Sequence, residues 1–493
     1  MKKPPFDLAN NESGIDRRLF LAASGVAMAG TLASGAGAMV AGDELTWMPA
    51  WKIRDAIVAR KYTALEVSDH FLARIAKLDP ILHAFLKLDA EGAREQAQAA
   101  DDTLKSGAKT GPLHGVPIAL KDHIAVKGLP WPRRGHAPSD GTKIKMDAAT
   151  EDSIVAERLR KAGAIIIGNT IMPGMGLGMD ITDLDQHARN PWDPEKVPGS
   201  SSAGSAAAVA SGMLPIAIGS DGGGSTRLPA SLCGVIGLHP TTGRVPNAVY
   251  DSQRLMLTTT FGPIARDMKD LAIVLQAISG PDGRDMLSTV HPPAPDYREQ
   301  FGKGAKGLKL GWTNDFGFAT KYFTPDSAAI IAQSRRAANG FTGLGASLDE
   351  PEVLLEDFWP HVASTMYHYE GNTQPPATMK AAMERRARNR AKMDALLREY
   401  DFILSTTIPF TAPTVQQWSD NWKDGVSFAP HYTSETFMFN WLQLPAISIP
   451  IGYYKGLPIG LQLVGRPDSE PRMFAAASAF LEKFPQNKRP KIS

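Results

Sequence analysis

Residues 220–229 read SDGGGSTRLP, and this stretch decides how the chain is interpreted. Three glycines, Gly222, Gly223 and Gly224, stand directly before Ser225. Residues without a Cβ let a backbone approach a ligand closely, with several amide groups converging on one point. Such amides, aimed at a developing oxyanion, contribute about 3 kcal/mol per donor to acyl transfer. We therefore predict that Gly222, Gly223, Gly224 and Ser225 form an oxyanion hole and that Ser225 is the nucleophile. A tight or phosphate-binding turn is the alternative, but the stretch matches neither phosphate-loop pattern.

A nucleophilic serine needs a base, and Lys121 is the candidate. It lies in the apolar run GVPIALKDHIAV, residues 115–126, which is bounded by glycine and typical of a buried strand. Burial disfavours the charged form of lysine, and the neutral amine is a competent base. The alternative is a lysine that extends from the strand end to solvent. His123, two residues later, is expected on the same face of the strand, with a structural role or a role beside the lysine.

The composition is that of an ordinary globular protein. Of 493 residues, 43% are hydrophobic and 21% charged, and the net charge of +2 offers no basis for a nucleic-acid partner. The basic run at residues 380–392 is interpreted as the solvated face of a helix. The single cysteine, Cys233, excludes an intrachain disulfide and a cysteine-rich metal site, and its apolar surroundings predict a buried thiol.

The N-terminus has the pattern of an export signal. Arg17 and Arg18 precede an apolar stretch rich in alanine and glycine, and Ala36-Gly37-Ala38 has the small-x-small form of a cleavage site. We predict a twin-arginine (Tat) signal over residues 1–38 that is removed on export to the periplasm or outside. A retained N-terminal membrane anchor is the alternative.

Helical patterns alternate with short apolar runs along the rest of the chain. Residues 63–66, TALE, form a capping box before a helix that is expected to end at Pro80, and residues 164–170, AIIIGNT, are typical of a buried strand. This alternation predicts an α/β fold with both faces of the sheet covered. Residues 199–205, GSSSAGS, have the composition of a linker but stand between core elements. Residues 444–467 predict a strand hairpin that returns to the core, followed by a helix over residues 471–483.

Five stretches carry a resemblance to a known family: GVPIALKDHIAVKG, ARNPWDPEKVPGSSSAGSAAAVASG, IGSDGGGSTRLPASLCGVIGLHPTTGRVP, YDFILSTTIPFTAP and LPAISIPIG…GLPIGLQLVGRP. In order and spacing the chain resembles the amidase signature family from about residue 45 to 485. The resemblance implies one large α/β domain, residues 39–493, with a mixed, many-stranded central sheet covered by helices on both faces. Residues 285–440 are expected to be its variable, substrate-shaping part.

The resemblance also implies a Ser–cis-Ser–Lys triad made of Lys121, Ser201 and Ser225, with a cis peptide between Ser200 and Ser201. Neutral Lys121 would take a proton through Ser201 while Ser225 attacks the carbonyl, giving an acyl-enzyme that water releases. Ser202 is expected to support Lys121, and Asp221 is expected to pair with Arg227 and brace the loop. The chain departs from the family pattern at Ser200, Ala203 and Gly222, and none of these departures removes a triad member.

The function implied is hydrolysis of an amide bond. Met172, Met175 and Met179 suggest an apolar pocket, which favours a hydrophobic or aryl amide, with esters or carbamates as side substrates. We expect no cofactor, no metal, no nucleic-acid partner and no stable membrane insertion after processing, and a homodimer is left open. Alternatives are a Ser-His-Asp hydrolase, an exported binding protein without hydrolytic activity, and a component of an amidotransferase complex.

Overall fold

The computed structural model describes residues 44–131, 147–172, 187–247, 258–359, 376–423 and 433–492. The chain from Glu44 onward belongs to one compact unit. The expected export signal and its cleavage site lie outside the described residues and stay a prediction. Among the residues that are described, no helix is long and apolar enough to cross a membrane.

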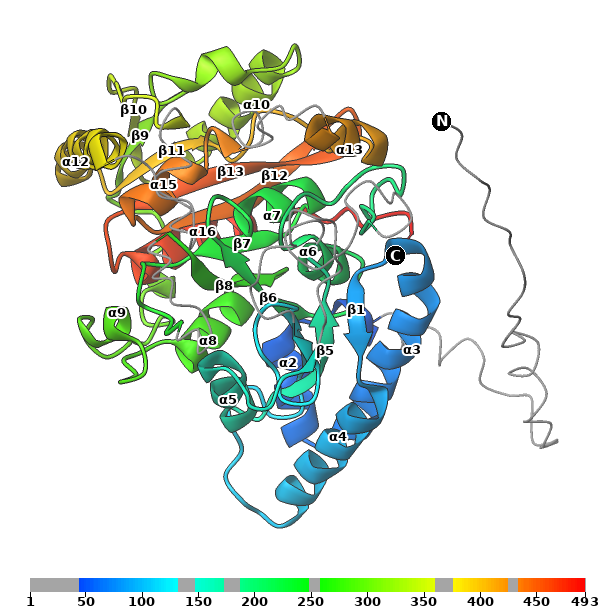
Figure 1. Cartoon of the computed structure of the whole chain (residues 1–493). Helices are drawn as coiled ribbons and strands as arrows, with labels where there is room; N and C mark the ends of the chain where they lie inside the picture. The colour runs from blue at the N-terminus through cyan, green and yellow to red at the C-terminus, as the bar shows by residue number, and fades with distance from the viewer. Residues whose placement is uncertain are drawn as a thin grey trace, which may run out of the picture. The chain divides into compact units, whose positions relative to one another are not determined.

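The described residues contain a mixed sheet of eleven strands (Figure 1). Its strands follow one another in this order across the sheet: β1 (Phe85–Leu88), β5 (Ile165–Thr170), β2 (Pro117–Lys121), β6 (Ile216–Asp221), β8 (Thr260–Ala265), β7 (Ile236–His239), β12 (Ala446–Tyr454), β13 (Leu457–Gly465), β11 (Phe402–Thr406), β9 (Lys309–Trp312) and β10 (Ser347–Asp349). A separate pair is formed by β3 (Pro130–Trp131) and β4 (Asp147–Ala148).

The sheet combines parallel and antiparallel pairs, as the resemblance implied. β2 runs parallel to both β5 and β6, and β11 and β10 run parallel to β9. The strands between β6 and β11 are antiparallel to their neighbours. β2, β5 and β6 are buried along their whole length, which explains why they read as continuous apolar runs without alternation.

Both faces of the sheet are covered by helices. Along β6, Ala217 packs in a cluster with α6 and α7, whereas Ile216 and Ile218 belong to the main core, which includes α8 and α16. Because successive side chains of a strand point to opposite faces, this alternation identifies two covered faces. The predicted α/β class with helices on both sides is confirmed.

Of the described helices, α12 and α3 are the longest, and two features of α3 bear on the expectations from sequence. The capping box of α3 forms, since Thr63 Oγ1 accepts from Glu66 N at 3.0 Å and Glu66 Oε2 accepts from Thr63 N at 2.8 Å. Pro80 does not end this helix but lies inside its last turn. The bounds are α2 (Ala50–Val58), α3 (Ala64–Leu82), α4 (Ala90–Lys105), α5 (Ile154–Lys161), α6 (Ala203–Ala210), α7 (Arg227–Cys233), α8 (Met268–Ile278), α9 (Met286–Thr289), α10 (Ser327–Asn339), α12 (Pro376–Glu399), α13 (Val415–Lys423), α15 (Phe437–Leu442) and α16 (Glu470–Lys483).

Residues 199–205 are no linker. Ser200, Ser201 and Ser202 are buried directly before α6, and α6 itself is buried along its length. The expected return hairpin is present as β12 and β13, which lie between β7 and β11 in the sheet. Residues 285–440 also contribute to the sheet, because β9, β10 and β11 form its far edge.

Candidate active site

The ends of two parallel strands bring the candidate residues together. β2 ends at Lys121 and β6 ends at Asp221, and Leu120 pairs with Ile218 in the register of these neighbours. Parallel strands end at the same edge of a sheet, so the glycine loop that follows β6 begins beside Lys121.

Lys121 contacts serine hydroxyls rather than extending to solvent. Its side chain is fully buried, and its Nζ lies 2.5 Å from Ser201 Oγ and 3.1 Å from Ser220 Oγ. The peptide bond between Ser200 and Ser201 is cis. Lys121 and Ser201 are therefore brought together as the resemblance implied, and Ser220 is an additional partner of the amine.

Ser202 supports Lys121 indirectly. Its hydroxyl donates to the carbonyl of Ser220 at 3.1 Å and accepts from the Ser220 amide at 3.2 Å. Ser202 thus holds the strand residue whose own side chain contacts Lys121. Its main-chain N–H donates to the carbonyl of Ser225 at 3.0 Å, which places the serine segment alongside the predicted nucleophile.

The predicted oxyanion hole has one donor fewer than expected. Ser225 is half-buried between β6 and α7, and the amides of Gly222, Gly223 and Ser225 donate to no other described residue. The Gly224 amide instead donates to Asp221 Oδ1 at 2.7 Å. Because the Asp221 carboxylate already accepts this N–H, the Gly224 amide is not available to bind an oxyanion, and Gly224 contributes to the shape of the loop instead.

Side-chain packing also explains the glycines. A Cβ on Gly223 would lie 2.5 Å from the Phe437 ring, and one on Gly224 would overlap the Thr436 hydroxyl. Gly224 also has a φ of +117°, a conformation that side chains disfavour. Both neighbours come from the start of α15, so this helix packs directly on the loop.

Asp221 and Arg227 form the predicted pair. Both side chains are fully buried, and the guanidinium binds the carboxylate through Nε–Oδ2 at 2.9 Å and Nη2–Oδ1 at 3.0 Å. Burial alone would raise the pKa of Asp221, but Arg227 outweighs this effect and holds that pKa well below its usual range. The remaining nitrogen of Arg227, Nη1, donates to Gln462 Oε1 at 2.7 Å.

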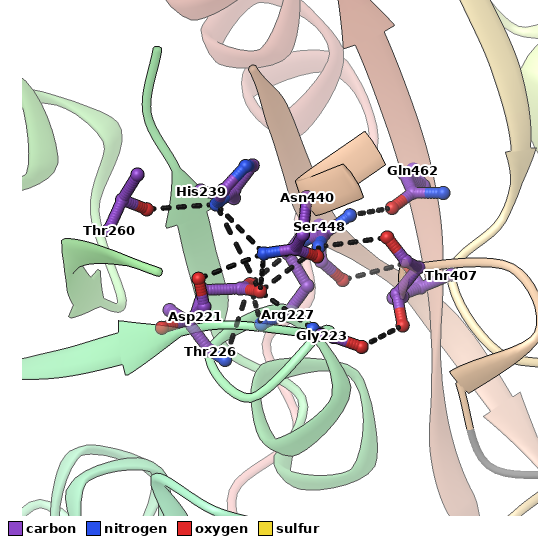
Figure 2. A network of polar contacts seen from close by, with 12 residues as sticks. Asp221, Gly223, Thr226, Arg227, His239, Thr260, Thr407, Asn440, Ser448 and Gln462 are labelled. Carbon is purple, nitrogen blue, oxygen red and sulfur yellow. Dashed lines mark hydrogen bonds and ion pairs between the residues drawn. The ribbon is translucent and has the colours of Figure 1, made fainter. Parts of the chain in front are cut away.

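Asn440 and His239 complete this buried network (Figure 2). Asn440 Oδ1 accepts from Arg227 Nη2 at 2.6 Å, and Asn440 Nδ2 lies 2.9 Å from Asp221 Oδ1 and 3.3 Å from His239 Nδ1. His239 Nδ1 also lies 2.8 Å from the Thr260 hydroxyl. Burial lowers the pKa of His239 to about 3, against the opposing effect of Asp221. This imidazole is therefore neutral at physiological pH.

Only one of the three pocket methionines can be placed. Met172 is buried directly after β5, and its amide donates to Asp122 Oδ2 at 2.8 Å. Met175 and Met179 lie outside the described residues. Aromatic rings lie beside the glycine loop: Phe437, which packs against Gly223, stacks on Phe358 at 5.0 Å between centroids.

His123 is not on the strand with Lys121. β2 ends at Lys121 because the chain turns there, and the amide of Asp122 donates to the Thr170 carbonyl. His123 is buried in this turn with its ring 5.9 Å from that of Phe261. The expectation of a shared strand face is wrong.

Two further predictions from composition have different outcomes. Cys233 is buried with its Sγ 3.6 Å from the Pro198 carbonyl, and burial raises the pKa of the thiol. The basic run is more than a solvated face, because Arg386 donates to the Trp441 carbonyl and Arg390 to the Leu442 carbonyl. These arginines of α12 satisfy the C-terminal carbonyls of α15.

Comparison with known proteins decides the family. The sequence model of the Amidase family matches residues 66–374 and 360–474. The chain belongs to the amidase family. It is an amide hydrolase of the amidase signature type, acting on C–N bonds.

Several known proteins are similar to this amidase. Acylamidase of Rhodococcus erythropolis is 30% identical over 468 residues, covering 88% of this chain and 95% of that protein. A glutamyl-tRNA(Gln) amidotransferase subunit of Moorella thermoacetica is 32% identical over 497 residues, covering 90% of this chain and 98% of that protein. The crystal structure of a bacterial aryl acylamidase of the amidase signature family superposes with a TM-score of 0.75 at 26% identity, covering 90% of this chain and 98% of that one.

Sequence reasoning missed five buried polar residues of the amidase that contact Lys121, Asp221, Arg227 or the glycine loop: Ser220, His239, Thr436, Asn440 and Gln462. One signal was available, since Asn440 stands inside the apolar run FMFNWL, residues 437–442. A buried amide needs hydrogen-bond partners, so an asparagine among aromatic residues indicates a polar network. The identity of its partners was not accessible, because Asp221 lies 219 residues away in the chain.

Proposed function

We propose that this amidase hydrolyses its substrate through an acyl-enzyme on Ser225, with Ser201 and Lys121 as the proton relay. The observation that carries the proposal is the 2.5 Å contact between the fully buried Lys121 Nζ and Ser201 Oγ, at the strand edge from which the Ser225 loop begins. Burial favours the uncharged amine, which can accept a proton.

Formation of the acyl-enzyme on Ser225 and its hydrolysis by water use the same relay. The Oγ–H proton of Ser225 passes to the Ser201 oxygen as the Ser201 proton passes to Lys121, and a Ser225 Oγ–C bond forms at the carbonyl carbon. The amides of Gly222, Gly223 and Ser225 hold the resulting oxyanion. The C–N bond then breaks while the leaving nitrogen takes a proton from Ser201, which Lys121 reprotonates. Water, deprotonated by the same relay, releases the acid and restores Ser225.

We propose a hydrophobic or aryl amide as the substrate. Similarity to an acylamidase and to a bacterial aryl acylamidase supports this class. The aromatic cluster of Phe358, Trp359, Phe437 and Trp441 supports it as well, because Phe437 packs against the backbone of Gly223. Aromatic side chains beside a reactive loop favour apolar, planar ligands.

The relatives that belong to amidotransferases suggest a second candidate, an amide-hydrolysing component of a larger complex. The net charge of +2 gives this candidate no electrostatic support for contact with nucleic acid. The isolated chain would then show little turnover of simple aryl amides.

The test uses the purified full chain. An activated fluorophosphonate probe should label the wild type on Ser225, and the labelled peptide can be identified by mass spectrometry. The substrate panel contains anilides, fatty amides, peptide amides, glutamine, carbamates and p-nitrophenyl esters. We expect anilides to be turned over fastest and Ser225→Ala to abolish both labelling and turnover. Labelling of a different serine would overturn the mechanism, and exclusive turnover of glutamine would overturn the substrate class.

A further inference from the structure

The start of α15 carries two side chains that reach the glycine loop. Thr436, the residue before the helix, and Asn440 are four residues apart and therefore lie on one side of its first turn. Both are fully buried, and both bond to the segment between Asp221 and Gly224. Neither belongs to the predicted triad.

The peptide unit between Gly223 and Gly224 is held at both ends. The Thr436 hydroxyl donates to the Gly223 carbonyl at 2.9 Å, and the Gly224 amide donates to Asp221 Oδ1 at 2.7 Å. A peptide unit is planar, so fixing its C=O and its N–H fixes the orientation of the whole plane. Glycine by itself permits many orientations. The N–H groups of Gly223 and Ser225, which are open donors of the loop, belong to the two adjoining peptide units, so the fixed plane between them restricts the directions in which they can point.

Asn440 holds the Asp221 carboxylate, which accepts the Gly224 amide. Arg227 can only donate, so its contact with Asn440 Oδ1 at 2.6 Å fixes which end of the amide is oxygen. The amide nitrogen must then face Asp221, where it lies 2.8 Å from the carbonyl and 2.9 Å from Oδ1. One side chain thereby orients both the carboxylate and the last peptide of β6.

We propose that Thr436 and Asn440 are positioning residues for acyl transfer, which set the direction of the oxyanion-binding amides by clamping the Gly223–Gly224 peptide. The inference rests on the proposed function, because it assigns these residues to the same loop. Neither residue touches the reacting atoms in this role. Their loss should weaken the transition state far more than it weakens substrate binding.

The first experiment compares Thr436→Val, which keeps the shape but removes the donor, with Thr436→Ser, which restores a hydroxyl. Turnover of a p-nitroanilide and of a p-nitrophenyl ester is measured together with Tm. We expect Thr436→Val to lower kcat about 10- to 100-fold, somewhat less than loss of a direct oxyanion donor, with KM changed less than about threefold. Thr436→Ser should recover most of kcat.

The matched control is Thr241→Val. Thr241 is also buried, and its hydroxyl accepts one main-chain amide, that of Asp468 at 2.8 Å, outside the loop. This control should lower Tm by a similar amount and leave kcat within about twofold. Equal losses of kcat in Thr436→Val and Thr241→Val would overturn the inference, because a general loss of stability would then explain both.

Asn440→Asp provides an independent arm. It replaces the donor that faces Asp221 with a second carboxylate, so kcat should fall at least as far as in Thr436→Val. If this variant does not fold, the threonine series alone decides. Failure of the two proposals can be told apart by the fluorophosphonate probe. If wild-type Ser225 is labelled and kcat is unchanged in Thr436→Val, only the positioning role of Thr436 is overturned. If wild-type Ser225 is not labelled, the proposed function itself is overturned.

Discussion

Lys121 and Arg227 are two basic side chains of the same site, and both are fully buried, yet their neighbours differ in chemistry. Arg227 binds a carboxylate through two nitrogens and uses its third on an amide oxygen. Lys121 is hydrogen-bonded to the hydroxyls of Ser201 and Ser220. A carboxylate holds a guanidinium charge in place, whereas a hydroxyl both donates and accepts and can pass a proton on. Burial alone therefore does not set the role of a basic side chain; the chemistry of its hydrogen-bond partners does.

The largest effect is expected from removing the Lys121 amine. Lys121→Ala should lower kcat/KM by at least about 10³-fold at pH 7, because it removes the final proton acceptor of the proposed relay, and high pH should restore part of the activity. A pH–rate profile of the p-nitroanilide reaction measures both effects. The matched control is Lys127→Ala, an exposed lysine six residues later, which should retain wild-type kinetics. Near-full activity of Lys121→Ala at neutral pH would show that the base is another group.

The next largest effect is expected from removing the guanidinium of Arg227. Arg227→Met leaves the buried Asp221 carboxylate without its charge partner, so the free energy of unfolding should fall by about 3–5 kcal/mol. Arg298→Met removes an arginine from the exposed pair with Asp296 and should cost about 0–1 kcal/mol. Urea unfolding measures both. A loss below about 1 kcal/mol for Arg227→Met would mean that the pair does not carry the loop's stability.

The smallest effect concerns the pH dependence of the same network. The pKa of His239 is about 3 in the folded protein and near its ordinary value of 6.5 once unfolded. Below pH 6.5 the unfolded chain therefore binds a proton that the folded chain refuses, and stability falls as the pH drops toward 3. At pH 5 this contribution is about 2 kcal/mol. The variant His239→Gln should flatten the stability profile between about pH 6.5 and 4, as measured by urea unfolding at a series of pH values. A slope identical to that of the wild type would contradict the assignment.

Local sequence signals predicted the elements that depend on nearby residues. The apolar runs predicted β2 and β5, the capping box of Thr63 predicted the start of α3, and the family pattern predicted that Lys121 and Ser201 lie close together. Where the prediction failed, a local turn decided the outcome. His123 lies in a turn closed by the Ile124 amide, which donates to the Lys121 carbonyl at 2.8 Å, and the Gly224 amide donates to Asp221, three residues earlier.

The contacts on the far side of the loop could not be predicted from spacing. Asn440 and Gln462 reach Arg227 across 213 and 235 residues, and no periodicity within a window of one helix or strand carries that information. The arginines of α12 that bond to the end of α15 are a further case, because a charge run on a helix looks the same whether it faces water or carbonyls.

The dependence of the loop on α15 and β13 has a consequence for biosynthesis. The proposed nucleophile, relay serine and lysine are all translated within the first half of the chain, but the groups that orient their backbone emerge only near its end. Contacts between residues far apart in sequence form slowly, because the entropy of loop closure must be overcome first. A nascent chain that stops before Thr436 would therefore carry every proposed reactive residue but lack the side chains that hold the glycine loop.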